Sequence, residues 1–509
     1  MRNFVSLLTL LLIVFVFSTI ESCQSDKPDI VIVNAKVVDG SGNRSYQAHV
    51  YVKDGIISQI DTALHNPSEG TKTIDAAGRV LAPGFIDVHS HGNPLTHGAF
   101  ANFLAMGVTT ITLGQDGFSP ATDSLAGWID SVDQKGIGPN IAMFIGHGTL
   151  RNLAGVGNTE QITAEQLKEM SGILEKNLPF TFGMSTGLEY APALYAAENE
   201  LLSLAAVVGK NDKMTMSHMR NEDDDAIINS IEELIDQGKY CQVHIAHLKS
   251  VYGKGAARAE EILKVLYDAR KAGVEITADV YPYMASYTGI AILFPDWAKT
   301  NEQLQKVIKT RRPELKEFIV NKVNARNGPD ATLFGTDPYK GKTLKQVADE
   351  MELPFEKVLI DSIGPEGASA AYFVMNKELQ ERFITDPLLA ISSDGSPVSY
   401  HPRGHGTFAK LIETYVVKDS KLTLEEAVRK VTSYPASILG LNKRGVIKTG
   451  YRADLILFDP QQVRAVADYS APHQLAEGFD YVIVNGKLAI EKGVLNKALF
   501  GKVLIPGID

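Results

Sequence analysis

The segment that most constrains the fold is residues 81–91, LAPGFIDVHSH, in which an apolar strand pattern ends in Asp87, His89 and His91. On an extended chain, residues two apart point to the same side, so both imidazoles can face one cleft. Neutral imidazole is the commonest metal ligand in proteins. The alternative is a pair of surface histidines after a strand, and the choice depends on whether later strands end in further ligands.

The composition excludes one class of partner. The 509 residues carry a net charge of −10 and no run of lysine or arginine, which argues against nucleic acid. A small substrate is not excluded, because local charge in a cleft can oppose the overall sign. The chain is long enough for a large core and more than one module.

The N-terminus has the pattern of an exported bacterial lipoprotein. Arg2 precedes an apolar run over residues 4–20, and Cys23 follows it. We expect a signal peptide at 1–22, a lipid on Cys23 that anchors the protein to a membrane of the cell envelope, and a tether at 23–28. Glu21 is unusual in such a motif, and an uncleaved helical anchor is the alternative. With Cys23 modified, the single remaining cysteine forms no disulfide framework.

The two ends of the chain are rich in strand patterns, whereas the middle alternates between strands and helices. We expect a small β-sandwich domain from residues 29–80 and 440–509. Residues 81–439 predict a TIM-like (β/α)8 barrel of the α/β class, with an inserted lid or subdomain at about 290–375. The eight strand-like stretches lie near 85–89, 108–114, 141–146, 180–183, 213–218, 241–247, 274–280 and 388–393.

Three later strand stretches also end in residues of the ligand type. His218 ends one, His247 ends the next, and Asp394 follows the last. In such barrels the active site lies at the C-terminal ends of the strands, so these side chains are expected to meet His89 and His91. Cys241 precedes His247 by six residues, about 20 Å along a strand, which favours a place in the core.

The order of these residues resembles the amidohydrolase superfamily, and the surrounding text is similar to its D-aminoacylase (N-acyl-D-amino-acid deacylase) branch. The likeness covers nearly the whole chain after the signal peptide. The matching stretches are APGFIDVHSH, GVTT (107–110), GHGTLR (146–151), STGLEY (185–190), SHMRNE (217–222), AHLK (246–249), DVYPY (279–283), SSDG (392–395), HPRGHGTF (401–408), PHQLAEG (472–478) and VIVNGK (482–487).

This resemblance implies a reaction with one or two divalent metal ions, most simply Zn²⁺. His218 and His247 would hold the principal metal, and His89 and His91 would line a second position. A bound metal lowers the pKa of water and polarises the amide carbonyl. Asp394 would take the proton of that water as general base and pass it to the leaving amine.

One position departs from the family. An Asn-Cys-Gly stretch after the second strand supplies a cysteine ligand there, whereas this chain has Gln115-Asp116-Gly117. A carboxylate can bind zinc or bridge two metals but is a harder ligand than thiolate. We therefore expect Asp116 to be a metal ligand, and the alternative is a solvated turn.

Substrate recognition would need a cationic or hydroxyl clamp, because an N-acyl amino acid carries a free carboxylate. Family positions expected to form it match Tyr190, Lys249 and one of Tyr281 or Tyr283. Arg220 and Arg403 are further candidates. The alternatives are packing at the rim for the tyrosines and partners of Glu222 or Asp279 for the arginines.

The sequence thus favours hydrolysis of N-acyl-D-amino acids to a carboxylate and a free D-amino acid. A second hypothesis keeps the site but changes the substrate to a cyclic amide or a dipeptide containing a D-residue. A third, a solute-binding lipoprotein, is disfavoured because a binder needs neither the full ligand set nor Asp394.

Overall fold

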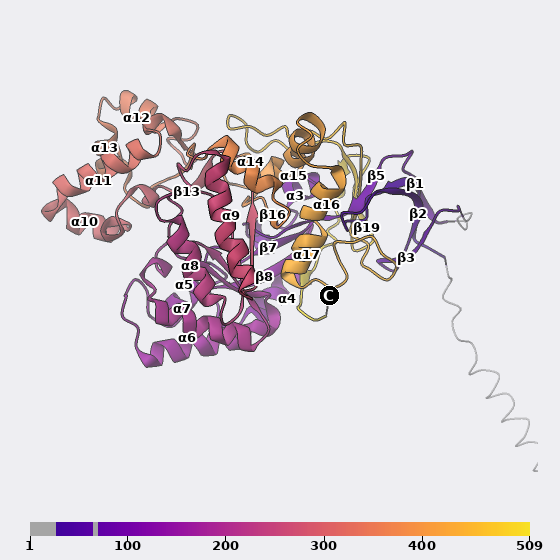
Figure 1. Ribbon diagram of the computed structural model, residues 1–509, viewed down its shortest axis with the longest axis horizontal. Helices are drawn as coiled ribbons and strands as arrows, with labels where there is room; N and C mark the ends of the chain where they lie inside the picture. Colours follow the sequence, from indigo (N-terminus) through magenta and orange to yellow (C-terminus); the bar gives the residue numbers. More distant parts are fainter. Residues whose placement is uncertain (1–26, 65–69, 509) are drawn as a thin grey trace, which may run out of the picture.

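The computed structural model describes residues 27–64 and 70–508. Its centre is a nearly closed barrel of eight parallel strands, which confirms the predicted fold class (Figure 1). A parallel bridge between Ser90 and Gly395 joins the ends of the first and last strands. The strands are β6 (Phe85–Asp87), β7 (Val108–Leu113), β8 (Asn140–Gly146), β9 (Gly183–Gly187), β10 (Met214–His218), β11 (Gln242–Ile245), β12 (Ile276–Val280) and β16 (Leu389–Ile391).

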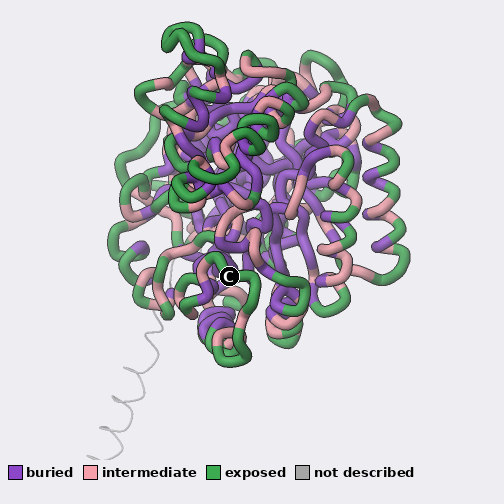
Figure 2. Tube along the Cα trace, turned by 90° about the vertical axis from the view of Figure 1, so that its left-hand side faces the viewer, coloured by how far each residue is buried: buried purple, intermediate pink, exposed green. Residues whose placement is uncertain are grey.

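Amphipathic helices surround the barrel. In α8, Ile227, Ile231 and Leu234 recur at helical spacing and are buried. Figure 2 shows the buried centre beneath outer turns that are largely exposed. In the described part of the chain, the α-helices outside the insertion are α2 (Pro94–His97), α3 (Ala101–Ala105), α4 (Leu125–Lys135), α5 (His147–Leu153), α6 (Ala164–Asn177), α7 (Glu198–Lys210), α8 (Ile227–Gln237), α9 (Gly255–Lys271), α14 (Lys377–Thr385), α15 (Arg403–Lys410), α16 (Leu424–Lys430) and α17 (Ser433–Leu439).

Strands from both ends of the chain form one mixed sheet beside the barrel (Figure 1, right). They are β1 (Ile30–Val37), β2 (Tyr46–Lys53), β3 (Ile56–Asp61), β4 (Lys72–Asp75), β5 (Val80–Pro83), β17 (Leu455–Phe458), β18 (Phe479–Val484), β19 (Lys487–Glu491) and β20 (Val494–Leu495). The two halves meet where β17 pairs antiparallel with β5. The last strand, β21 (Val503–Leu504), leaves this sheet and pairs with β8 of the barrel.

The region between β12 and β16 forms a separate layer (Figure 1, upper left). A three-stranded antiparallel sheet of β13 (Ser286–Gly289), β14 (Thr332–Phe334) and β15 (Ser369–Tyr372) packs with α10 (Asn301–Thr310), α11 (Arg312–Ala325), α12 (Leu344–Glu350) and α13 (Phe355–Lys357). Its apolar side chains, such as Leu304, Leu315 and Phe334, form a core of their own. We call this layer the inserted subdomain.

The fourth barrel strand was placed too early by the sequence pattern. The expected stretch was 180–183, but Leu178–Phe180 is a short 3-10 helix that contains Pro179, and β9 begins at Gly183. The residues of β9 are Gly, Met, Ser, Thr and Gly, all buried. Because only one of them has a large apolar side chain, the strand carries little hydrophobic signal.

The predicted signal peptide, Cys23 and most of the tether lie outside the described residues. Among the helices in residues 27–64 and 70–508, none combines the length and the apolar character needed to cross a membrane.

Lys430 is a buried lysine near the start of the last barrel strand, and the effect of its burial on stability can be tested. Its fully buried ammonium donates to the carbonyl oxygens of Asp386 and Leu389. Burial lowers the pKa of Lys430 from 10.5 to about 7. Between these values the unfolded chain binds a proton that the folded chain lacks, so the free energy of unfolding should rise with pH.

We expect Lys430→Met to remove this dependence. The difference between the free energies of unfolding of wild type and variant should grow by about 1 kcal/mol per pH unit above neutrality. Urea denaturation at several pH values measures it. Parallel pH profiles for the two proteins would show that Lys430 titrates normally.

Candidate active site

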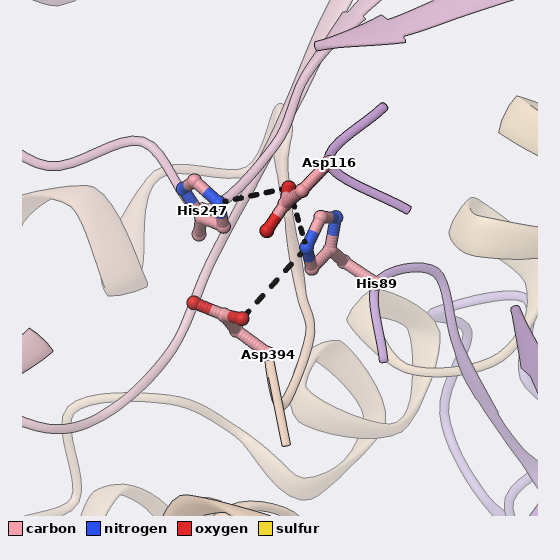
Figure 3. A group of neighbouring side chains, drawn as sticks. All are labelled: His89, Asp116, His247 and Asp394. Carbon is pink, nitrogen blue, oxygen red and sulfur yellow. Dashed lines mark ion pairs between the residues drawn. The ribbon is translucent and has the colours of Figure 1, made fainter. Parts of the chain in front are cut away.

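Ligand-type side chains from five barrel strands converge at the C-terminal end of the barrel. Figure 3 shows His89, Asp116, His247 and Asp394 pointing toward one another, and these four offer ligand atoms within 4.8 Å of each other. His91 follows β6 together with His89, Asp116 follows β7, His218 ends β10, His247 follows β11 and Asp394 follows β16. The structure therefore brings together all six residues that the sequence selected for the metal and for proton transfer.

Three of these residues have a positive φ, a backbone conformation that residues other than glycine rarely adopt. Asp116, His247 and Asp394 have φ values of 54°, 39° and 48°. Such conformations cost about 1–3 kcal/mol each and cluster at functional sites. Hydrogen bonds hold two of the turns: the His247 amide donates to Asp279 Oδ1 at 2.9 Å, and the Asp394 amide donates to the His89 carbonyl at 2.8 Å.

The two oxygens of Asp116 face different imidazoles. Asp116 Oδ1 lies 3.3 Å from His89 Nε2 and 3.6 Å from His247 Nε2, whereas Oδ2 lies 3.5 Å from His91 Nε2. Two ligands that bind one tetrahedral zinc at about 2.0–2.1 Å are about 3.3 Å apart. The spacing of these atoms therefore fits ligands of a shared cation.

Hydrogen-bond partners give a second indication of a cation site. His89 Nε2 and Asp116 Oδ1 are both buried, and neither has a hydrogen-bond partner among the residues that the structure describes. Buried polar atoms are nearly always hydrogen-bonded, so unpaired ones that face each other need another partner. A divalent cation fits this place, because imidazole nitrogen and carboxylate oxygen are both zinc ligands.

His218 and His247 form a second group with Glu222. His218 Nδ1 lies 3.0 Å from His247 Nε2, and on the far side of its ring His218 Nε2 lies 3.1 Å from Glu189 Oε2. His247 Nδ1 is likewise 3.2 Å from Glu222 Oε1. Each imidazole can thus present one nitrogen to a metal while the other donates to a carboxylate, an arrangement typical of metal-binding histidines.

Asp394 lies between the imidazoles and an arginine. Its Oδ1 is 3.2 Å from His91 Nε2, and its Oδ2 is 2.7 Å from Arg403 Nη1. Burial alone would raise the pKa of Asp394, but Arg403 and His247 hold it well below its ordinary value. The carboxylate is therefore ionised at neutral pH and can accept a proton.

The carboxylates give the cluster a strongly negative field. Burial and Lys249 act to lower the pKa of His247, but Asp394, Asp116 and Glu222 raise it to about 10. Burial acts to raise the pKa of Asp116, but the imidazoles of His89, His247 and His91 hold it well below its ordinary value. Positive charge is thus favoured between these groups, and a metal ion would supply it while displacing protons from the imidazoles.

Two buried aspartates position the cluster from below. Asp279 accepts from the His247 amide and from Ser392 Oγ, and its Oδ2 lies 2.7 Å from His244 Nε2. Asp87 accepts from the amide and hydroxyl of Ser393, the residue before Asp394. Both link neighbouring strands of the barrel at the level of the site.

A cavity of about 350 Å³ opens over the cluster. Of the predicted substrate-binding residues, Tyr190, Lys249 and Arg403 line it. Lys249 Nζ lies 2.5 Å from Glu222 Oε1. Tyr281 lies beneath, with its ring 5.8 Å from Lys249 Nζ and 5.0 Å from the guanidinium carbon of Arg403.

Three of the six predicted substrate-binding residues do not line this cavity: Tyr281, which lies beneath it, Arg220 and Tyr283. Arg220 is turned outward, with its guanidinium Nε 3.0 Å from Glu233 Oε2 and Nη1 donating to the Leu194 carbonyl. Neither of the partners considered from the sequence, Glu222 or Asp279, pairs with it. Tyr283 is buried, and its hydroxyl donates to the Pro402 carbonyl at 3.4 Å. A long side chain on a loop can turn toward the cavity or away from it. Packing with α8 directs Arg220 away from the cavity.

Sequence reasoning overlooked Glu189 as a partner of His218 and Glu222 as a partner of His247. Both lie inside motifs that drew attention for other residues, STGLEY and SHMRNE. The signal that could have found them is chemical: a metal-binding histidine usually has a second-layer carboxylate, and both glutamates lie in stretches that match the family. Cys241, by contrast, is buried in the core as expected.

Comparisons with known proteins identify the family. A model of an amidohydrolase family matches residues 345–490. The chain is 30% identical to an N-acyl-D-aspartate deacylase of Alcaligenes xylosoxydans xylosoxydans, over 96% of this chain and 98% of the relative. The chain belongs to the D-aminoacylase family of amidohydrolases. It is also 30% identical to an N-acyl-D-glutamate deacylase of the same organism, over 91% and 94% of the two chains.

Solved structures agree with this assignment. An N-acyl-D-glutamate deacylase from Bordetella bronchiseptica, complexed with zinc and a phosphonate inhibitor, superposes with a TM-score of 0.81 at 27% identity, over 94% of this chain and 100% of that one. A D-aminoacylase structure gives the same TM-score at 25% identity, covering 94% and 99%. The protein is therefore a metal-dependent amidohydrolase related to the N-acyl-D-amino-acid deacylases.

The contact between Glu189 and His218 gives a test of the metal centre. Glu189→Gln keeps the shape but removes the charge that orients His218, so we expect zinc affinity to fall about tenfold. Competition with a chromophoric chelator measures the affinity. The matched control is Glu233→Gln, which removes the partner of Arg220 outside the cavity. Equal losses in both variants would show that Glu189 has no special link to the metal.

Proposed function

We propose that this enzyme hydrolyses the amide bond of N-acyl-D-amino acids and releases a free D-amino acid. The observation that carries the proposal is the pairing of Asp394 with Arg403 beside the ligand cluster, inside a chain related over nearly its full length to two N-acyl-D-amino-acid deacylases. Asp394 can transfer a proton to the amide nitrogen, and Arg403 can bind a carboxylate close to that nitrogen.

We also propose zinc as the metal, because a related structure contains it and the ligand atoms suit it. His218, His247 and Asp116 would hold one ion, and His89, His91 and Asp116 would hold a second. When bound, the metal lowers the pKa of water and polarises the amide carbonyl. Asp116 would serve both positions, because its carboxylate lies close to imidazoles of both sets: Oδ1 faces His89 and His247, and Oδ2 faces His91.

The protein side chains then move one proton and bind the substrate. Asp394 Oδ1 faces the imidazoles and takes the proton of the attacking water, while Arg403 keeps Asp394 ionised through Oδ2. Asp394 returns the proton to the amine as the carbon–nitrogen bond breaks. Tyr190 and Lys249, which also line the cavity, bind polar atoms of the substrate and help to keep it oriented.

A substrate panel tests the proposal. Zinc-reconstituted protein is assayed with N-acetyl-D-amino acids, their L-enantiomers, dipeptides with a C-terminal D-residue, and hydantoins. We expect release of free D-amino acids from the first group. Faster cleavage of dipeptides or hydantoins would favour the second hypothesis, and dipeptides from the cell wall are natural candidates if Cys23 anchors the enzyme in the envelope as its sequence suggests.

Asp394→Asn separates proton transfer from metal binding. We expect kcat to fall by about 10²–10⁴-fold, because the amide cannot take the proton. Metal content, measured by elemental analysis, should stay near that of the wild type. If Asp394→Asn kept near-full turnover, the role in proton transfer would be wrong.

Asp116→Ala tests the other carboxylate of the cluster. In this variant, unlike Asp394→Asn, we expect the metal content to fall. The variant loses the oxygens that face His89, His91 and His247, so we expect elemental analysis to show less zinc per chain than in Asp394→Asn. Undiminished zinc in Asp116→Ala would mean that the imidazoles alone hold the metal.

A further inference from the structure

A second cavity adjoins the active site and has no role in the reaction described above. Its volume is about 250 Å³, and it lies between the barrel and the inserted subdomain. The wall that it shares with the catalytic cavity consists of Phe118, Tyr190, Thr288 and Ile292, which line both. The two cavities are therefore neighbouring compartments of one site.

The walls of the second cavity are mainly small or apolar. Ala191, Gly289 and Ala291 add to Phe118 and Ile292. Phe118 is 48% exposed, so a large apolar ring at the mouth is open to solvent. An apolar group that entered here would cover this ring and gain from the loss of water on both surfaces.

The charged side chains named in the lining of this cavity already have partners. Lys299 Nζ lies 3.2 Å from Asp296 Oδ1 and donates to the Glu189 carbonyl at 3.3 Å. Glu366 Oε2 accepts from the Asn301 amide at 3.1 Å. Within the described lining, no cation is unpaired and able to attract a carboxylate. Binding of an acidic ligand group in this cavity is therefore disfavoured.

The position of the cavity decides which part of the substrate it receives. Under the proposed function, Asp394 and Arg403 hold the amine side of the amide; Asp394 lies 3.2 Å from His91 Nε2 and pairs with Arg403. The second cavity is reached past Tyr190, whose hydroxyl is 3.3 Å from His218 Nδ1 and accepts from Thr288. His218 is at the other end of the ligand cluster, so the chain that leaves the carbonyl carbon away from the amine points toward Tyr190.

From this geometry we infer that the second cavity is a subsite for the acyl group, and that the enzyme prefers uncharged acyl chains longer than acetyl. The inference rests on the proposed function. A volume of 250 Å³ holds about eight groups the size of a water molecule, at about 30 Å³ each. An unbranched acyl chain of about six to eight carbons would fill it.

Chain length is the direct test. The substrates are N-acetyl, N-butanoyl, N-hexanoyl and N-octanoyl derivatives of one D-amino acid, assayed with zinc-reconstituted enzyme. Because each buried methylene strengthens binding several-fold, we expect kcat/KM to rise at least about tenfold from acetyl to hexanoyl and then to level off. Succinyl, which ends in a carboxylate, should fall below butanoyl.

Variants that fill the cavity locate the effect. Ala291→Phe adds bulk from the wall, and we expect the hexanoyl-to-acetyl ratio of kcat/KM to fall to near one. Gly289→Leu is a second variant, because Gly289 has φ −62° and a Cβ there would meet no heavy atom within 4 Å. Ala291→Ser, which adds little bulk, is the matched control and should keep the ratio. The ratio does not depend on how much of each variant is folded.

The outcomes separate the two proposals. Cleavage of N-acetyl substrates with no gain from longer chains overturns the acyl subsite and leaves the proposed function intact. A gain that persists in both Ala291→Phe and Gly289→Leu also overturns it. If none of the acyl derivatives is cleaved, the proposed function itself fails.

Discussion

The site depends on the contact between the first and last barrel strands, β6 and β16, which we call the seam. The Asp394 amide donates to the His89 carbonyl, and the His91 amide donates to the Gly395 carbonyl, both at 2.8 Å. Asp87 accepts from Ser393 across the same seam. Residues about three hundred positions apart in the chain become neighbours only because the barrel closes here, so the proposed general base and two of the proposed metal ligands share one structural cause.

The sequence predicted the elements whose signal is local. Barrel strands such as β7 and β8 are continuous apolar or β-branched runs, and helices such as α8 repeat their buried side chains at helical spacing. The ligand cluster could be predicted for a topological reason: parallel strands of a barrel end at one face, so a histidine or aspartate after each strand must approach the others. The β9 strand was misplaced because its buried residues are small.

The sequence could not show which of several possible partners a long side chain contacts. Arg220 stands two residues after His218, a proposed metal ligand, yet it pairs with Glu233 on α8 and points away from the cavity. Arg403 turns inward to Asp394. Arg220 follows the end of β10 and Arg403 begins α15, and only the packing of helices and loops around each one selects the direction of its side chain. Tyr283 shows the same limit, since it is two residues from Tyr281 but its hydroxyl turns to a backbone carbonyl.

The aspartate at position 116 stands where the family pattern has a cysteine, and the structure gives it a physical meaning. A thiolate offers one sulfur atom, so any bridge must pass through that atom. Asp116 instead places separate oxygens against His89 and His91, with His247 sharing the first oxygen. Carboxylate oxygen is also a harder ligand than sulfur, which shifts affinity toward harder divalent cations. The substitution therefore bears on which metal the centre selects and leaves the convergence of the imidazoles unchanged.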